Sequence, residues 1–203
     1  MFLPRNIVIL PSNSITTQAI SLSSQINTVV PSKILLNTTQ EIPHITLYQA
    51  LFPEENISLV LDSLAQVLSS QKRFSLTLSE VSVVLGTIFW NAVLSDMLMR
   101  FHSSIVDALN QLRNGAYNKE DRNLPGFTSE MEHSLQTYGM WAAKELYLPH
   151  LTLSRPIDEN RCDEAKASLP EKIVSEFSVE TIAFVEMGHD GTCQKILEKF
   201  SLK

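Results

Sequence analysis

The sequence has few cysteines, no surplus of basic residues and no long apolar run. Cys162 and Cys193 stand outside any CxxC or Cys/His ligand spacing, so neither a disulfide framework nor a zinc site is expected, and a reducing compartment fits them. The 16 Lys and Arg are outnumbered by 22 Asp and Glu, which gives a net charge of −6. This balance argues against a protein that wraps long nucleic acid, because such binding relies on a basic surface.

The sequence also lacks the patterns of membrane insertion and of several common enzyme classes. The most apolar stretch, residues 81–94, contains polar residues and is too short to span a bilayer. No basic region precedes an apolar run at the start, so no signal peptide is expected. A Gly-rich phosphate loop, a GxSxG elbow and an HExxH motif are all missing. With 44 % hydrophobic residues in 203, the chain is expected to be a globular, cytoplasmic protein.

The chain does contain strand and helix patterns that alternate along its length. Strands are predicted at residues 6–10, 33–36, 42–48, 74–79, 83–93, 148–153 and 177–187. Helices are predicted at residues 15–26, 53–70, 95–113, 129–146 and 158–168, and residues 194–202 suit either form. The mixed order favours an α+β fold over a doubly wound sheet. The polar residues 114–127 predict a loop or an insertion.

One hexapeptide occurs twice, once in each half of the chain. Residues 42–47 are IPHITL and residues 148–153 are LPHLTL. Such an internal repeat predicts a pseudo-symmetric molecule of two lobes. Residues two apart in a strand project from the same face, so His44 should project with Thr46, and His150 with Thr152.

The repeated residues form a set that suits phosphate chemistry if the two lobes face each other. The hydroxyls of Thr46 and Thr152 can donate to phosphoryl oxygens. One imidazole can take a proton from an attacking water, and the other can give a proton to the leaving oxygen. We therefore predict His44 and His150 as the catalytic pair and the two threonines as phosphate-binding, with no metal or other cofactor required. We assign His150 as the base and His44 as the acid, although the roles exchange if the substrate binds in the opposite direction.

The paired HxT motifs resemble those of the 2H phosphoesterase superfamily, within it the bacterial 2′-5′ RNA ligase-like group, also called RNA 2′,3′-cyclic phosphodiesterases. The likeness includes the opening strand that ends at Pro11, the run from His150 to Arg155, which is similar to that group's HxTLxR, and the closing segment 177–202. It implies one domain over residues 1–203, in which two antiparallel-rich sheets flanked by helices enclose a central cleft. It also implies hydrolysis of a nucleoside or RNA-terminal 2′,3′-cyclic phosphate, or of a 2′-5′ linkage. Residues 48–52 depart from the Phe-Leu-Gly common in that group, which leaves the substrate open.

Two other candidate residues, Arg155 and Tyr48, have two interpretations each. Arg155 can steer a phosphate, or it can pair with a carboxylate at the strand end. Tyr48 is expected on the His44 face, where it can stack on a base or fill space at the rim. Trp90 is predicted in the core. The other histidines, His102, His133 and His189, are predicted to be structural or on the surface.

Two functions other than catalysis remain open. A non-catalytic module could bind a nucleotide or an RNA end in the same cleft, and a scaffold protein could retain a vestigial cleft. The net charge of −6 fits a mononucleotide, an ADP-ribose derivative or a short RNA end better than duplex nucleic acid. No membrane partner is expected, and the sequence does not indicate an oligomeric state.

Overall fold

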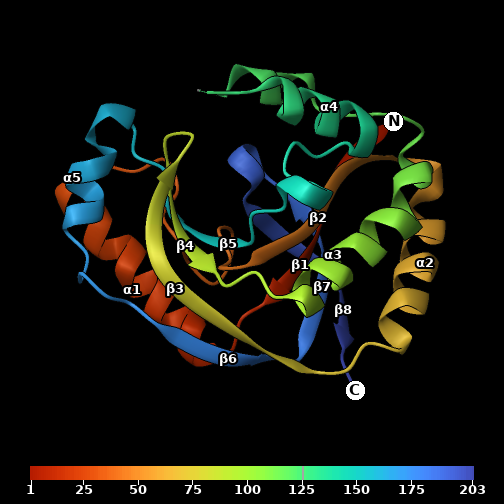
Figure 1. The fold of residues 1–203 in the computed structure, drawn as a ribbon, viewed down its shortest axis with the longest axis horizontal. Coiled ribbons are helices and arrows are strands. Elements are labelled where there is room, and N and C mark those ends of the chain that lie inside the picture. Colours follow the sequence, from red (N-terminus) through yellow and green to blue (C-terminus); the bar gives the residue numbers. More distant parts are fainter. Residues whose placement is uncertain (125) are drawn as a thin grey trace.

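A computed structural model describes residues 1–124 and 126–203, and a curled antiparallel sheet of eight strands forms its centre (Figure 1). The strands are β1 (Phe2–Leu10), β2 (Ile45–Pro53), β3 (Phe74–Val84), β4 (Thr87–Ala92), β5 (His150–Ser154), β6 (Ser175–Val179), β7 (Thr181–Met187) and β8 (Cys193–Ser201). The helices are α1 (Asn13–Val29), α2 (Ile57–Ser69), α3 (Asp96–Leu109), α4 (Ser129–Tyr138) and α5 (Cys162–Ala167).

The order of the strands divides the sheet into two similar halves. The order is β6-β3-β4-β5-β2-β1-β7-β8. The two HxT strands, β5 and β2, are therefore neighbours at the centre, where Ile45 lies opposite Leu151. The predicted α+β class is confirmed, and the two expected sheets are the halves of one continuous sheet.

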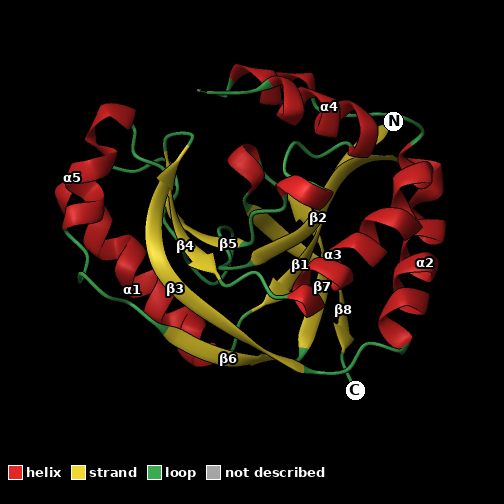
Figure 2. Cartoon of the chain, viewed as in Figure 1, coloured by secondary structure: helices red, strands yellow, loops and turns green. Residues whose placement is uncertain are grey.

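The helices pack around this sheet in two groups, with α1 and α5 at one end and α2 and α3 at the other (Figure 2). On α1 the buried residues Ile15, Ala19, Leu22 and Ile26 have the helical spacing that the sequence analysis predicted. Trp90 of β4 is fully buried, and its indole N–H donates to the carbonyls of Ser79 and Ile173. The prediction of a core role for Trp90 is therefore confirmed. None of the described helices combines the length and the apolar character that a bilayer crossing needs.

Several predicted elements have different limits because single residues interrupt the backbone. Residues 33–36 do not form a strand. The predicted strand 83–93 is divided by a turn in which Leu85 and Gly86 both have positive φ angles, of 51° and 72°, so residues 83–84 belong to β3. The predicted strand 177–187 is divided at Glu180 into β6, which pairs with β3, and β7, which pairs with β1.

The predicted helix 129–146 is also shorter than expected. It ends at Tyr138 because Gly139 adopts a left-handed conformation with a φ of 77°. Its N-cap is Thr128, whose hydroxyl accepts from the amide of Met131.

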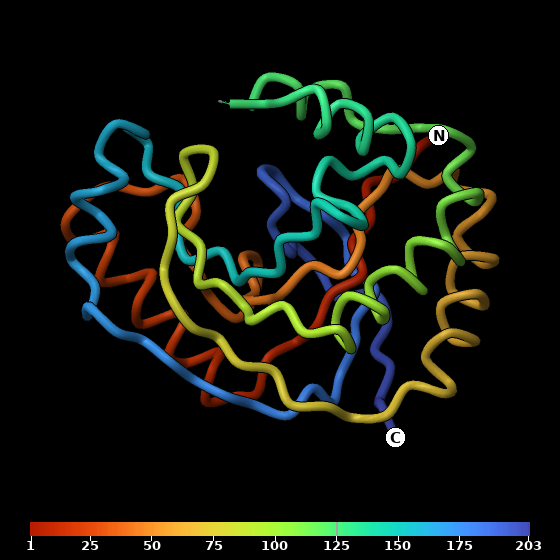
Figure 3. Tube along the Cα trace, in the orientation of Figure 1, coloured from red at the N-terminus to blue at the C-terminus, as the bar shows by residue number. Residues whose placement is uncertain are grey.

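A segment between α3 and β5 passes over the open side of the sheet (Figure 3). It contains the short 3-10 helix Lys119–Asn123 and α4, and within the predicted loop 114–127 only Pro125 lies outside the described residues. The guanidinium of Arg113, which is 3 % exposed, donates to the carbonyls of Gln136 and Thr137 at the end of α4. A cation is favoured there by the helix dipole. Arg113 therefore holds this segment, the cover, in place.

Candidate active site

A cleft of about 710 Å³ lies between the cover and the sheet, and both HxT motifs line it. His44 and Thr46 approach it from one half of the sheet, and His150 and Thr152 approach it from the other half. The leucines and isoleucines between them, Ile45, Leu47, Leu151 and Leu153, are fully buried. Strand alternation thus separates the polar cleft face from the apolar core face.

The two histidines are held in the same way by their own backbone. In each motif Nδ1 contacts the carbonyl oxygen two residues earlier, at 2.8 Å for His44 and Ile42 and at 2.7 Å for His150 and Leu148. A neutral imidazole that donates from Nδ1 keeps a lone pair on Nε2. Each ring therefore has one nitrogen committed to the backbone and one available for proton transfer.

Burial lowers the pKa of both imidazoles because it disfavours their charged form. The pKa of His150 falls to about 4, through burial first and then through the charge of His44. For His44, the backbone of Ile42 and that of Gly191 both oppose the decrease in pKa. For His150 the backbone of Leu148 opposes the decrease in the same way, so two backbone contacts favour the protonated form of His44 and one favours that of His150.

A β-bulge in each HxT strand changes which residues face the cleft. Val8 pairs with Thr46 and Ile7 pairs with Tyr48, so Leu47 is an extra residue on β2. In the other half, Phe89 pairs with Thr152 and Ile88 pairs with Ser154. The extra residue places two buried positions in succession and reverses the alternation beyond them.

The bulge explains why the expected position of Tyr48 is wrong. Tyr48 is fully buried, and its hydroxyl donates to the carbonyl of Tyr138 at 2.6 Å, so it supports α4 from below. Burial also raises the pKa of this hydroxyl. The next residue, Gln49, lines the cleft instead. A strict period-two alternation does not predict that Gln49 rather than Tyr48 faces the cleft, because the bulge depends on pairing with β1.

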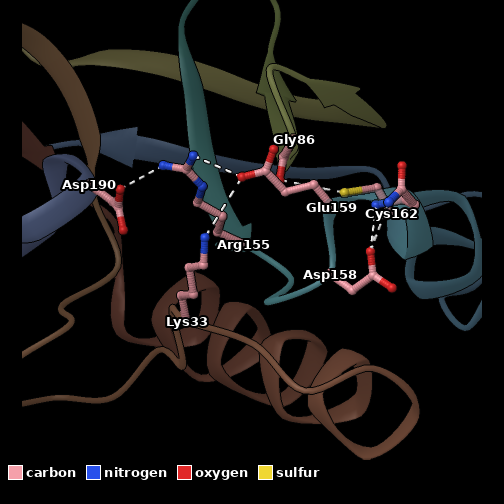
Figure 4. A network of polar contacts seen from close by, with 8 residues as sticks. Lys33, Gly86, Arg155, Asp158, Glu159, Cys162 and Asp190 are labelled. Carbon is pink, nitrogen blue, oxygen red and sulfur yellow. Dashed lines mark hydrogen bonds and ion pairs between the residues drawn. The ribbon is translucent and has the colours of Figure 1, made fainter. Parts of the chain in front are cut away.

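Arg155 occupies the position in the second motif that Gln49 occupies in the first, and it also lines the cleft. Its guanidinium bonds to Asp190 at 2.6 Å and to Glu159 at 3.0 Å, and Glu159 also pairs with Lys33 at 3.8 Å (Figure 4). The carboxylate pairing that the sequence analysis considered for Arg155 is therefore present. It links β5 to the turn between β7 and β8.

The structure adds residues that the sequence analysis did not select. Phe89 lies against His150, Asn6 bonds to Thr46, and Trp141 lines the cleft from the cover. His189 is exposed and also lines the cleft, although no partner in the sequence indicated this. All four lie outside the HxT motifs along the chain, and only the fold brings three of them to the cleft and Asn6 against Thr46.

The remaining histidines, His102 and His133, do not line the cleft. His133 is exposed on α4. His102 is fully buried, where Nδ1 contacts the carbonyl of Leu47 and Nε2 accepts from the amide of Lys144. The structural interpretation of His102 therefore agrees with its contacts. In the described part of the chain, no three His, Cys, Asp or Glu residues lie close enough together to hold a metal ion.

Two HxT strands that meet at the centre of a curled antiparallel sheet, and face one cleft, define the architecture of a 2H phosphoesterase. The sequence profile of the 2′-5′ RNA ligase superfamily matches residues 21–191. The chain belongs to this superfamily, as its motifs predicted.

Solved structures share this fold at low sequence identity. TT0787 of Thermus thermophilus is 18 % identical, with a TM-score of 0.59 over 98 % of both chains. E. coli LigT complexed with 3′-AMP is 13 % identical, with a TM-score of 0.63 over 100 % of this chain and 99 % of that one. The MHV ns2 PDE domain is 10 % identical, with a TM-score of 0.53 over 97 % and 99 %. No curated protein sequence matches the chain.

Proposed function

We propose that the protein is a metal-independent phosphodiesterase that opens a nucleoside or RNA-terminal 2′,3′-cyclic phosphate, with 2′-5′ linkages as the related substrate. The observation that carries this proposal is the presence of two imidazoles with available Nε2 atoms, each beside a threonine hydroxyl, in one cleft. Proton transfer at both ends of a phosphoester displacement needs two such groups. A site that only binds a nucleotide does not.

In the proposed reaction, His150 Nε2 takes a proton from a water whose oxygen attacks phosphorus. The bond between phosphorus and the 3′-oxygen breaks, and protonated His44 gives its proton to that oxygen, which yields a 2′-phosphate. The threonine hydroxyls bind the non-bridging oxygens, where negative charge increases in the transition state. The low pKa of His150, of about 4, suits the base, and the two backbone contacts of His44, with Ile42 and Gly191, suit the acid.

The charges in the cleft lining support a small substrate with little negative charge. Glu120, Asp121 and Asp190 line the cleft, and Arg155 is already paired with Asp190 and Glu159. A cyclic phosphate diester carries a single negative charge, so these carboxylates repel it less than they repel a polyphosphate. Nucleotide binding is further supported by the fold neighbour E. coli LigT, which has been crystallised with 3′-AMP and with NADP+.

The proposal is tested by the release of 2′-monophosphate from the four nucleoside 2′,3′-cyclic phosphates in EDTA. We expect turnover by the wild type and a loss of at least about 10²-fold for His44→Ala and for His150→Ala, as for a lost general acid or base. His133→Ala is the control, because this histidine is exposed and outside the cleft.

Two results would contradict the proposal. Full activity in either cleft variant would remove the two-histidine mechanism. An inactive wild type that also fails on 2′-5′ oligonucleotides and on ADP-ribose cyclic phosphate, yet binds nucleotides saturably, would favour the binding module.

A further inference from the structure

Asn6 is a fully buried polar residue at the start of the apolar half of β1. It lies in β1, and the next residues, Ile7, Val8 and Ile9, are fully buried like Asn6 itself. Its Nδ2 donates to Thr46 Oγ1 at 3.0 Å. Among the described residues its Oδ1 has no hydrogen-bond partner.

Burial of this amide is unfavourable for stability. An amide transferred from water into a protein interior loses its hydration, and one carbonyl oxygen without a partner is not compensated. An apolar side chain of similar size would avoid that loss. Among the described residues, the bond to Thr46 is the one hydrogen bond that the Asn6 side chain makes. We therefore look for the role of Asn6 in its effect on Thr46.

We propose that Asn6 is a positioning residue that directs the hydroxyl proton of Thr46 toward the substrate phosphate. A threonine hydroxyl has one proton to donate and two lone pairs. Because Oγ1 already accepts from Asn6, its own O–H must point elsewhere. Thr46 lines the cleft, so a phosphoryl oxygen there is the acceptor within reach.

The second motif has no equivalent support, which makes it an internal control. Val8 pairs with Thr46 and Phe89 pairs with Thr152, so the position that corresponds to Asn6 is Thr87 on β4. Within the described part of the chain, no side-chain hydrogen bond reaches the Thr152 hydroxyl. The two threonines should therefore respond differently to substitution of Asn6.

This inference rests on the proposed function, and a double-mutant cycle tests it. We expect Asn6→Leu to lower kcat on 2′,3′-cyclic nucleotides about tenfold and to raise KM by a smaller factor of about two, since the bond matters more in the transition state than in the ground state. In a Thr46→Val background, Asn6→Leu should have no further effect on kcat. In a Thr152→Val background it should still lower kcat about tenfold.

Further variants separate positioning from stability. Asn6→Ser shortens the side chain and serves in the same cycle if the leucine variant does not fold. Ser154→Ala removes a fully buried strand hydroxyl that bonds to Ser32 and lies outside the cleft lining. It should lower the melting temperature without a change in kcat.

The outcomes distinguish this inference from the proposed function. An active wild type in which the effects of Asn6 and Thr46 are additive would overturn the role of Asn6 and leave the function intact. A wild type that is inactive on 2′,3′-cyclic nucleotides, on 2′-5′ oligonucleotides and on ADP-ribose cyclic phosphate would overturn the function. Affinity for inorganic phosphate, measured on the same variants by calorimetry, then decides the role of Asn6. Weaker binding by Asn6→Leu, absent in the Thr46→Val background, would support that role, and any other pattern would overturn it.

Discussion

The ring of Phe89 lies parallel to the imidazole of His150, with ring centroids 3.5 Å apart and planes inclined by 15°. The aromatic ring covers one face of the imidazole and keeps water from it. Since burial is the main cause of the low pKa of His150, of about 4, Phe89 supplies part of that effect. This stacking contact gives the first of five predictions.

Phe89→Leu should raise the pKa of His150 toward its ordinary value of about 6.5, because a smaller side chain leaves the imidazole better hydrated. The acidic limb of the pH profile of kcat/KM should therefore move to higher pH. Trp141→Leu is the control, since Trp141 lines the cleft without stacking on His150. It should alter KM and leave the limb in place, and a limb unmoved in Phe89→Leu would refute the prediction.

The pH profile of the wild type should be bell-shaped, with its maximum on the acid side of neutrality. The reaction needs one imidazole neutral and the other protonated, and this form is most abundant between their two pKa values. Both pKa values lie below 6.5. The value of kcat/KM should therefore fall as the pH rises above about 6.5. A profile that is flat from about pH 5 to about pH 9 would contradict the acid–base pair.

Neighbouring residues Tyr48 and Gln49 should have separate effects. Tyr48→Phe removes the hydrogen bond to the carbonyl of Tyr138 and should lower the free energy of unfolding by about 1–2 kcal/mol, with little effect on KM. Gln49→Ala should leave stability nearly unchanged and raise KM, because Gln49 lines the cleft. Denaturant unfolding and steady-state kinetics measure the two effects. The reverse pattern would show that the bulge does not direct these side chains as described.

Acid should destabilise the fold below about pH 6.5, the ordinary histidine pKa, because the unfolded chain then binds protons that buried histidines do not. Burial lowers the pKa values of His44, His102 and His150. Protonated His102 could no longer accept the bond from Lys144 at Nε2. Asp121 acts in the opposite direction, since burial raises its pKa to about 6, but it is one group against three.

The melting temperature should therefore fall between pH 7 and pH 5, and fall less in His102→Gln, which loses one titrating group. An equal decrease in both proteins would show that His102 does not contribute to the pH dependence.

Substrate charge should decide preference among the candidate ligands. Addition of a 5′-triphosphate to a nucleoside 2′,3′-cyclic phosphate should lower kcat/KM, because Glu120 and Asp121 line the cleft and repel the added charge. The double variant Glu120→Gln, Asp121→Asn should reduce this difference, and so should higher salt. Equal kcat/KM values for the two substrates in the wild type would contradict this electrostatic selection.

Local residue patterns were sufficient to predict the class of fold and the strand face from which the side chains of the two HxT motifs project. The alternation His44, Ile45, Thr46, Leu47 and its repeat at His150 place polar groups on one face of a strand and apolar groups on the other, whatever lies around them. The buried stripe of α1 follows from the same kind of short-range periodicity.

Only the tertiary structure decided what surrounds those motifs. The bulge at Leu47 depends on how β2 pairs with β1, so the exchange of Tyr48 for Gln49 has no signal in the strand itself. The contacts of Asn6 with Thr46, Phe89 with His150 and Arg155 with Asp190 join residues far apart in the chain. Such pairs are set by strand order and register. Residues close in sequence thus determined which chemical groups the two HxT motifs carry. Pairing between strands distant in the chain determined which other side chains lie beside those groups.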